Sequence, residues 1–127
     1  NTVGTTADSP LLMSTSNDEG QRWTSPVAVR ASSTNPAGGL LANGVAYRMY
    51  GRPGQFVTFC ADGTGKQWGN DVTLVAADAD TCANSSDVVL GSDRFMIAYT
   101  DYGHRDATGR LRKAVLVREV VVEPPTT

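Results

Sequence analysis

Residues 16–23 read SNDEGQRW, and residues 60–68 read CADGTGKQW. Each stretch contains an Asp, a Gly and a closing Trp, and each is followed after a few residues by a Val-rich run. Trp23 and Trp68 are 45 residues apart. A second pair of similar stretches places Tyr50 and Tyr99 at a spacing of 49. The two spacings agree on a repeated unit of about 45 residues, which is long enough for four short antiparallel strands.

The rest of the chain consists of short apolar runs separated by turn residues. No stretch carries apolar residues at i, i+3, i+4 and i+7 over three turns, so no helix is expected. Residues 43–44, 51–54, 62–65 and 91–93 separate the runs, because Gly and Asn tolerate the positive φ of tight turns. The pattern predicts an all-β chain with nine strands, over residues 11–15, 26–30, 38–42, 45–50, 55–61, 72–76, 86–90, 94–100 and 113–122.

The composition excludes two classes of partner. Of the 127 residues, 40% are hydrophobic and 19% are charged, with 11 Lys and Arg against 13 Asp and Glu. A net charge of -2 provides no basic surface for nucleic acid or anionic lipid. No apolar run approaches the roughly 20 residues of a membrane span. We therefore expect no nucleic-acid or membrane partner, and we expect the chain, which starts at Asn1 without a signal segment, to begin inside a longer gene product.

The two Asp-containing stretches resemble the Asp box of the sialidase (neuraminidase) superfamily, a repeat of β-propellers. The resemblance rests on Ser16, Asp18, Gly20 and Trp23 in the first copy, and on Asp62, Gly65 and Trp68 in the second. The second copy has one inserted residue, and Cys60 stands in the place of the Ser. The motif is structural, because its Asp accepts hydrogen bonds from turn amides, its Gly takes a positive φ and its Trp packs onto the sheet. An ordinary β-sandwich with two polar turns is the alternative fold.

The resemblance implies that this chain is the C-terminal portion, about two and a quarter four-stranded antiparallel blades, of a six-bladed propeller. Residues 1–31 would hold two strands of one blade, residues 37–77 a complete blade, and residues 84–122 the last blade, before a tail over residues 123–127. Nine strands cannot close such a ring, and open sheet edges need a cover. We therefore expect the remaining blades to come from a second chain or from a homo-oligomer.

In this family the substrate binds on the face of the propeller opposite the Asp-box turns. The resemblance therefore points to three loops, over residues 51–54, 77–85 and 100–112. Arg52 is the first candidate for substrate binding, because sialidases hold the substrate carboxylate with arginines through two parallel hydrogen bonds that a Lys cannot reproduce. The competing interpretation is a surface Arg paired with a neighbouring acid.

The last of these loops collects titratable side chains. Asp101, Tyr102 and Arg105 are expected to contact the sugar, and Tyr102 and His104 are candidates for catalysis, since His titrates near neutral pH. A solvated polar loop is the alternative. Sialidases use a Tyr nucleophile, and the matching position here is Asn84, whose amide cannot act as a nucleophile.

Cys60 and Cys82 are predicted to lie at opposite ends of a blade, too far apart for a disulfide. We expect both to be free, or one to pair with the missing part. No cofactor is expected, and no metal site, because two Cys without a clustered His do not make a zinc site. The acidic loop at residues 77–80 is of a kind that seldom binds Ca²⁺. Residues 84–86 form a glycosylation sequon of a kind that is common by chance.

The resemblance implies a secreted or periplasmic carbohydrate-active protein. This chain, without activity of its own, would contribute to a sialidase-like exo-glycosidase that acts on anionic terminal sugars once the propeller is complete. Two alternatives remain open. One is a non-catalytic glycan-binding propeller, which Asn84 and the absence of a complete acid/base pair favour. The other is an interaction module whose open edges bind another protein chain.

Overall fold

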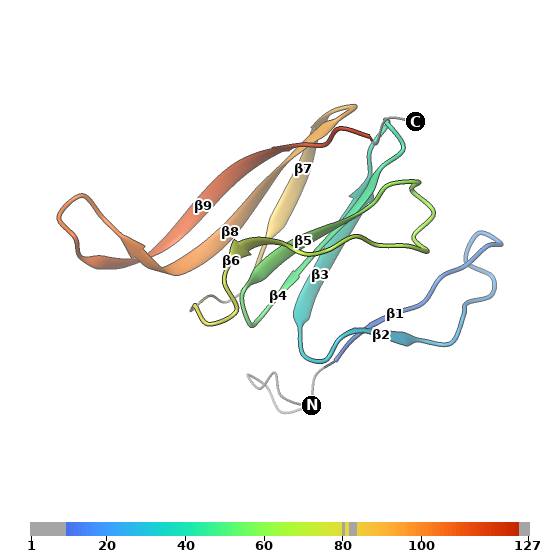
Figure 1. Cartoon of the computed structure of the whole chain (residues 1–127), viewed down its shortest axis with the longest axis horizontal. Helices are drawn as coiled ribbons and strands as arrows, with labels where there is room; N and C mark the ends of the chain where they lie inside the picture. The colour runs from blue at the N-terminus through green and yellow to red at the C-terminus, as the bar shows by residue number, and fades with distance from the viewer. Residues whose placement is uncertain (1–9, 80, 82–83, 125–127) are drawn as a thin grey trace.

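The structure, a computed structural model, describes residues 10–79, 81 and 84–124 (Figure 1). Within these residues the chain forms nine strands and no helix, so the prediction of an all-β chain is confirmed. The strands are β1 (Leu11–Met13), β2 (Val27–Arg30), β3 (Thr34–Leu40), β4 (Ala46–Gly51), β5 (Gln55–Cys60), β6 (Val72–Val75), β7 (Ser86–Gly91), β8 (Arg94–Arg105) and β9 (Leu111–Val121).

The strands form three antiparallel sheets, and none of these is closed on itself. β1 and β2 form a two-stranded sheet, β3 to β6 form a four-stranded sheet, and β7 to β9 form a three-stranded sheet. Within each sheet the spatial order is the order along the chain. Every strand pair is therefore made by neighbours in sequence, which keeps the connections short.

The core lies between the four-stranded and the three-stranded sheet. Side chains alternate between the two faces of a strand, and Tyr47 and Met49 of β4 point to the same face. They pack against Phe95 and Ile97 of β8, and all four side chains are almost completely buried. The rings of Tyr47 and Phe95 stack, with centroids 3.9 Å apart and an interplanar angle of 5°. Burial of these side chains holds the two sheets together.

The two-stranded sheet packs on the opposite face of the four-stranded sheet. Arg30 of β2 lies over the ring of Phe56, with 4.3 Å between its Cζ and the ring centroid. It also forms an ion pair with Asp71, which in turn accepts a hydrogen bond from the Tyr50 hydroxyl. Arg48 donates to the sulfur of Met13 on β1. The four-stranded sheet is therefore the middle of three layers.

The hairpin of β8 and β9 is longer than the sequence suggested. Residues 100–112 were expected to form a loop, but the strands continue to Arg105 and restart at Leu111 (Figure 1). The physical reason is the turn at residues 106–110, where Asp106 accepts hydrogen bonds from turn amides and closes the ribbon directly. The outer half of this ribbon projects beyond the other sheets, so its residues carry no apolar alternation that would mark a strand (Figure 1).

The start of β3 also differs from the prediction. The sequence predicted strands over residues 26–30 and 38–42, with no strand between them. The strand instead begins at Thr34, which pairs with Gly51, and it ends at Leu40. An irregularity in register between Thr34 and Ala37, next to Asn35 at a φ of 53°, lets this polar segment join the sheet.

The outer face of the three-stranded sheet is uncovered in this structure. Val88 of β7 and Val115, Val117 and Val121 of β9 are each more than half exposed. β9 lies at the edge of its sheet, because β8 is its one strand partner among the described residues. A long edge strand beside exposed aliphatic side chains is a surface that folded proteins normally cover.

The stacked rings in the core give the first test. Phe95→Ala should lower the free energy of unfolding by about 3–5 kcal/mol, because it leaves a cavity under Tyr47. Urea denaturation of the full chain measures the change. Leu111→Ala, at a side chain that is 59% exposed, is the control and should change the free energy by less than about 0.5 kcal/mol. Equal effects of the two substitutions would contradict this account of the core.

Candidate functional site

The first Asp-containing turn, residues 15–24, is held by a closed set of hydrogen bonds. Asp18 Oδ1 accepts from the Arg22 amide at 2.8 Å and from the Ser16 hydroxyl at 2.9 Å. Ser16 Oγ in turn accepts from the amide of Gly20, at 2.9 Å. Hydrogen bonds from the Arg22 side chain and amide and from the Ser16 hydroxyl lower the pKa of Asp18. The carboxylate therefore serves the turn itself.

The second turn, residues 59–69, repeats the pattern with sulfur in place of oxygen. Cys60 Sγ donates to Asp62 Oδ1 at 3.2 Å and accepts from the amide of Gly65 at 3.3 Å. Asp62 also accepts from the amide and the hydroxyl of Thr64, and these bonds lower its pKa. Cys60 is a free and buried cysteine, as predicted, whereas Cys82 lies outside the described residues.

The tryptophans close both turns in the same way. Trp23 Nε1 donates to the carbonyl of Gly20, and Trp68 Nε1 donates to the carbonyl of Gly65, each at 2.9 Å. The residue after each Trp then donates its amide across the neck of the turn, Thr24 to Thr15 and Gly69 to Phe59. The turns satisfy their own polar groups, so their role is structural, and their assignment to the Asp-box family remains a prediction.

A third Asp-centred turn, which the sequence analysis missed, closes the β8–β9 hairpin. Asp106 Oδ1 accepts from the amides of Thr108 and Arg110, each at 3.0 Å, and Oδ2 accepts from the side chain of Arg112. These partners, led by the Thr108 hydroxyl, lower the pKa of Asp106 to about 2. The signal in the sequence was Asp106-Ala107-Thr108-Gly109, which resembles Asp62-Gly63-Thr64-Gly65 but lacks a following Trp.

Arg52 lies in the β4–β5 turn, at the end of the four-stranded sheet opposite the second Asp-containing turn. Its backbone has a φ of 56°, which a residue other than Gly seldom adopts, and its amide donates to the carbonyl of Gly54 at 3.0 Å. The hydroxyl of Ser33 donates to the carbonyl of Gly51 at 2.7 Å. A side chain at Gly54 would meet the carbonyl of Val75. The β4–β5 turn is therefore held by the hydrogen bond from Ser33, by its own hydrogen bond to Gly54 and by the close approach of Gly54 to Val75.

Polar side chains gather around this turn. Gln55, which is fully buried, donates through Nε2 to the carbonyl of Tyr50 and to the hydroxyl of Ser85. Asn84 Oδ1 accepts a hydrogen bond of 2.8 Å from Asn35 Nδ2. Asn84, which the resemblance aligns with the nucleophile of sialidases, thus pairs with another amide. Such groups hydrogen-bond the hydroxyls of a ligand, and they perform no nucleophilic step.

Two buried side-chain oxygens at this end have no partner among the described residues. They are Gln55 Oε1 and Ser32 Oγ, and Ser32 precedes the residue that binds the β4–β5 turn. An unsatisfied buried oxygen costs roughly 1–3 kcal/mol, so folded proteins keep few of them, and a donor from outside the described residues would stabilise this end.

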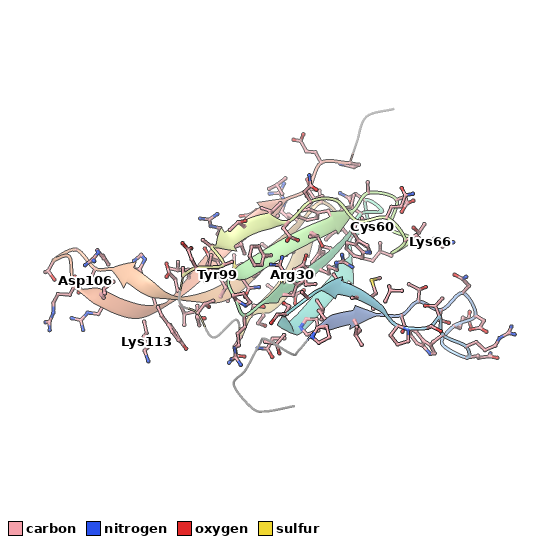
Figure 2. All side chains as sticks on the ribbon, turned by 60° about the horizontal axis from the view of Figure 1, so that its bottom comes forward. Arg30, Cys60, Lys66, Tyr99, Asp106 and Lys113 are labelled. Carbon is pink, nitrogen blue, oxygen red and sulfur yellow. The ribbon has the colours of Figure 1, made fainter. Side chains whose placement is uncertain are left out.

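The other predicted site residues lie on the projecting hairpin. Asp101 accepts from the amide of Gly103, the ring of Tyr102 lies 5.0 Å from Lys113 Nζ, and Arg105 donates to the carbonyl of Gly109. His104 is exposed and pairs across the ribbon with Arg112. Figure 2 shows Asp106 and Lys113 on this ribbon, far from Cys60 and Lys66. These residues belong to strand and ribbon, and the expectation that they lie in a loop is wrong.

The described residues hold no group of three or more His, Cys, Asp or Glu side chains that is able to bind a metal ion. Within the acidic loop at residues 77–80, Asp78 is exposed and Asp80 lies outside the described residues. The described part of the chain also contains no helix long and apolar enough to cross a membrane.

Comparison with known proteins leaves the family open. No family model matches the chain, and neither a curated protein nor a solved structure matches it.

The sulfur-centred turn gives a second test. Cys60→Ser should keep this turn, because Ser16 makes the same two hydrogen bonds in the first turn. Cys60→Ala removes both bonds and should leave the chain about 1 kcal/mol less stable than the Ser variant. Denaturant unfolding of the two variants measures the difference. An Ala variant as stable as the Ser variant would mean that the sulfur contributes packing alone.

The third turn should respond to acid. Because the pKa of Asp106 falls from an ordinary value of 3.8 to about 2, its stabilising effect is complete above about pH 4 and is lost as the pH falls through 2. NMR should show the Arg110 amide shifting with a midpoint near pH 2, and Asp106→Asn should abolish that transition. A midpoint near pH 4 would contradict the hydrogen-bonded turn.

Proposed function

We propose that this chain forms part of a β-propeller of the sialidase type, and that the complete protein is a secreted or periplasmic carbohydrate-active protein. In this proposal the chain supplies groups that bind the carboxylate and hydroxyls of an anionic terminal sugar. The exo-glycosidase chemistry rests with acid, base and nucleophile groups on the remaining blades. These come from a second chain or from further copies of this one.

The layered sheets support the propeller. The four-stranded sheet has the strand order of a complete blade, and incomplete sheets lie against both of its faces. The inner strands β3 and β7 approach each other, as the first strands of neighbouring blades do around a propeller axis. The exposed valines on the three-stranded sheet offer a further blade the same kind of apolar contact that holds the core.

The observation that carries the binding role is the polar end around Arg52. Arg52 stands on the β4–β5 turn, which is held by the hydroxyl of Ser33 and the carbonyl of Gly54. The hydrogen-bonded amides of Asn35 and Asn84 lie at the same end, because Thr34 pairs with Gly51. The two buried oxygens that have no partner among the described residues also lie there. A guanidinium beside amides and hydroxyls matches a carboxylated sugar, because the charge is recognised bidentately and the hydroxyls by the neutral groups.

A non-catalytic glycan-binding propeller is the second candidate function. The hydrogen bond between Asn35 and Asn84 favours it, because an amide stands where a sialidase carries its nucleophile. Both candidates require Arg52 for binding, and they differ in whether the sugar is released.

The full-length gene product should be tested with a fluorogenic sialoside and, separately, for binding of free N-acetylneuraminic acid. Arg52→Lys keeps the charge but loses the paired hydrogen bonds, and should weaken binding or raise KM by about tenfold to a hundredfold. Arg118→Lys, on the exposed part of β9, is the matched control and should leave both measurements unchanged.

The outcomes separate the two candidates. Hydrolysis that depends on Arg52 supports the glycosidase, whereas binding that depends on Arg52 without hydrolysis supports the glycan-binding propeller. If the wild-type protein binds no anionic sugar, or if Arg52→Lys behaves as Arg118→Lys does, the proposed role of this end is wrong.

A further inference from the structure

A second candidate site lies between the two-stranded and the four-stranded sheet, at the end opposite Arg52. It is a groove of about 410 Å³, which is within the usual size range of small-molecule sites. Its lining includes Met13, Thr15, Thr24, Arg48, Lys66 and Trp68. These residues come from both sheets and from the two Asp-containing turns.

Arg48 is the half-buried cation of this groove. Its Cζ lies 4.0 Å from the centroid of the Trp68 ring, Nε donates to the hydroxyl of Thr58 at 3.0 Å, and Nη1 contacts the sulfur of Met13 at 3.0 Å. A thioether is a weak acceptor. Burial lowers the pKa of Arg48, but a guanidinium keeps its charge at neutral pH. The three groups in direct contact with the guanidinium, on Trp68, Thr58 and Met13, are all uncharged.

The nearby acid offsets the charge of Arg48 only in part. The charge of Asp71 acts to raise the pKa of Arg48, but the same carboxylate forms an ion pair with Arg30, so the three groups together keep one net positive charge. Among the described residues, no carboxylate lies within 4.0 Å of the Arg48 guanidinium. A half-buried positive charge that is only partly offset is costly, and a bound anion would repay part of that cost.

Lys66 adds a second positive charge at the same groove. It is exposed, and within the described chain no carboxylate forms an ion pair with its ammonium group. The hydroxyls of Thr15 and Thr24 lie 3.4 Å apart at the neck of the first Asp-containing turn, where they are able to hydrogen-bond a polar ligand. Figure 2 shows Lys66 at the same end of the molecule as Cys60.

We infer that this groove binds a small organic oxyanion, a carboxylate or phosphate group on a body of monosaccharide size. Arg48 holds the oxyanion from the floor of the groove and Lys66 holds it from the opening. The threonine hydroxyls contact the body, and Trp68 fixes the plane of the guanidinium. The site is separate from the Arg52 end, because the two lie at opposite ends of β4 and β5.

The full chain should be titrated with glucuronate, with glucose 6-phosphate and with neutral glucose, while NMR follows the indole N–H signals of Trp68 and Trp23. At least one of the two anions should shift the Trp68 signal to saturation, and glucose should not. The tighter of the two anions identifies carboxylate or phosphate as the preferred group. The inference is overturned if neither anion shifts the signal, or if glucose shifts it equally.

Variants then locate the site. Lys66→Gln changes an exposed side chain and should weaken anion binding about threefold to tenfold without affecting the fold, and Arg48→Lys should weaken it at least tenfold. Arg118→Gln is the control for loss of one positive charge and should bind as the wild type does. Arg52→Lys should also bind normally here, which separates this site from the sugar site proposed above. Binding that is unchanged in Lys66→Gln and Arg48→Lys would overturn the inference.

Discussion

The four-stranded sheet buries side chains on both of its faces, and the positions of the other two sheets depend on this. One face is aromatic and aliphatic, with Tyr47 stacked on Phe95. The other face is aromatic and cationic, with Arg30 over Phe56 and Arg48 over Trp68. An antiparallel sheet that exposes one face to solvent has to bury side chains on its other face only. The guanidinium groups let the second face be buried, because they stack on rings and still find hydrogen-bond acceptors.

The turns explain how short strands hold their register. Each Asp-containing turn satisfies its own amides through one carboxylate and closes with an indole bond to a glycine carbonyl. Ser16 Oγ in the first turn and Cys60 Sγ in the second turn take equivalent places. The pattern therefore needs an atom that both donates and accepts a hydrogen bond, and either oxygen or sulfur meets this need. Because these bonds are local, the turn is able to form with the hairpin and to fix the pairing of its strands.

Much of the fold was predictable, since the apolar runs at residues 45–50, 55–61 and 94–100 are short and bounded by turn residues, which is typical of buried strands. The outer half of the β8–β9 hairpin was not, because both of its faces meet solvent and leave no alternation to detect. The site was predictable in part. Arg52 was proposed from its place between Gly51 and Pro53, but Asn35, which reaches the same end of the sheet from β3, carries no local signal in the sequence. Arg48 was missed because its neighbours in space, Met13 and Trp68, are distant in sequence.

The two ends of the sheets differ in how completely their hydrogen bonds are made. At one end the Asp-containing turns pair carboxylates, amides and indoles among themselves, so a ligand there has to be recognised by charged side chains that the turns do not use, such as those of Arg48 and Lys66. At the other end Gln55 Oε1 and Ser32 Oγ are buried, and no group of the described residues donates a hydrogen bond to them. Folding tolerates such oxygens where water, a ligand or another chain supplies the donor. A ligand that donates hydrogen bonds at the Arg52 end would therefore satisfy two oxygens that the described residues leave unpaired.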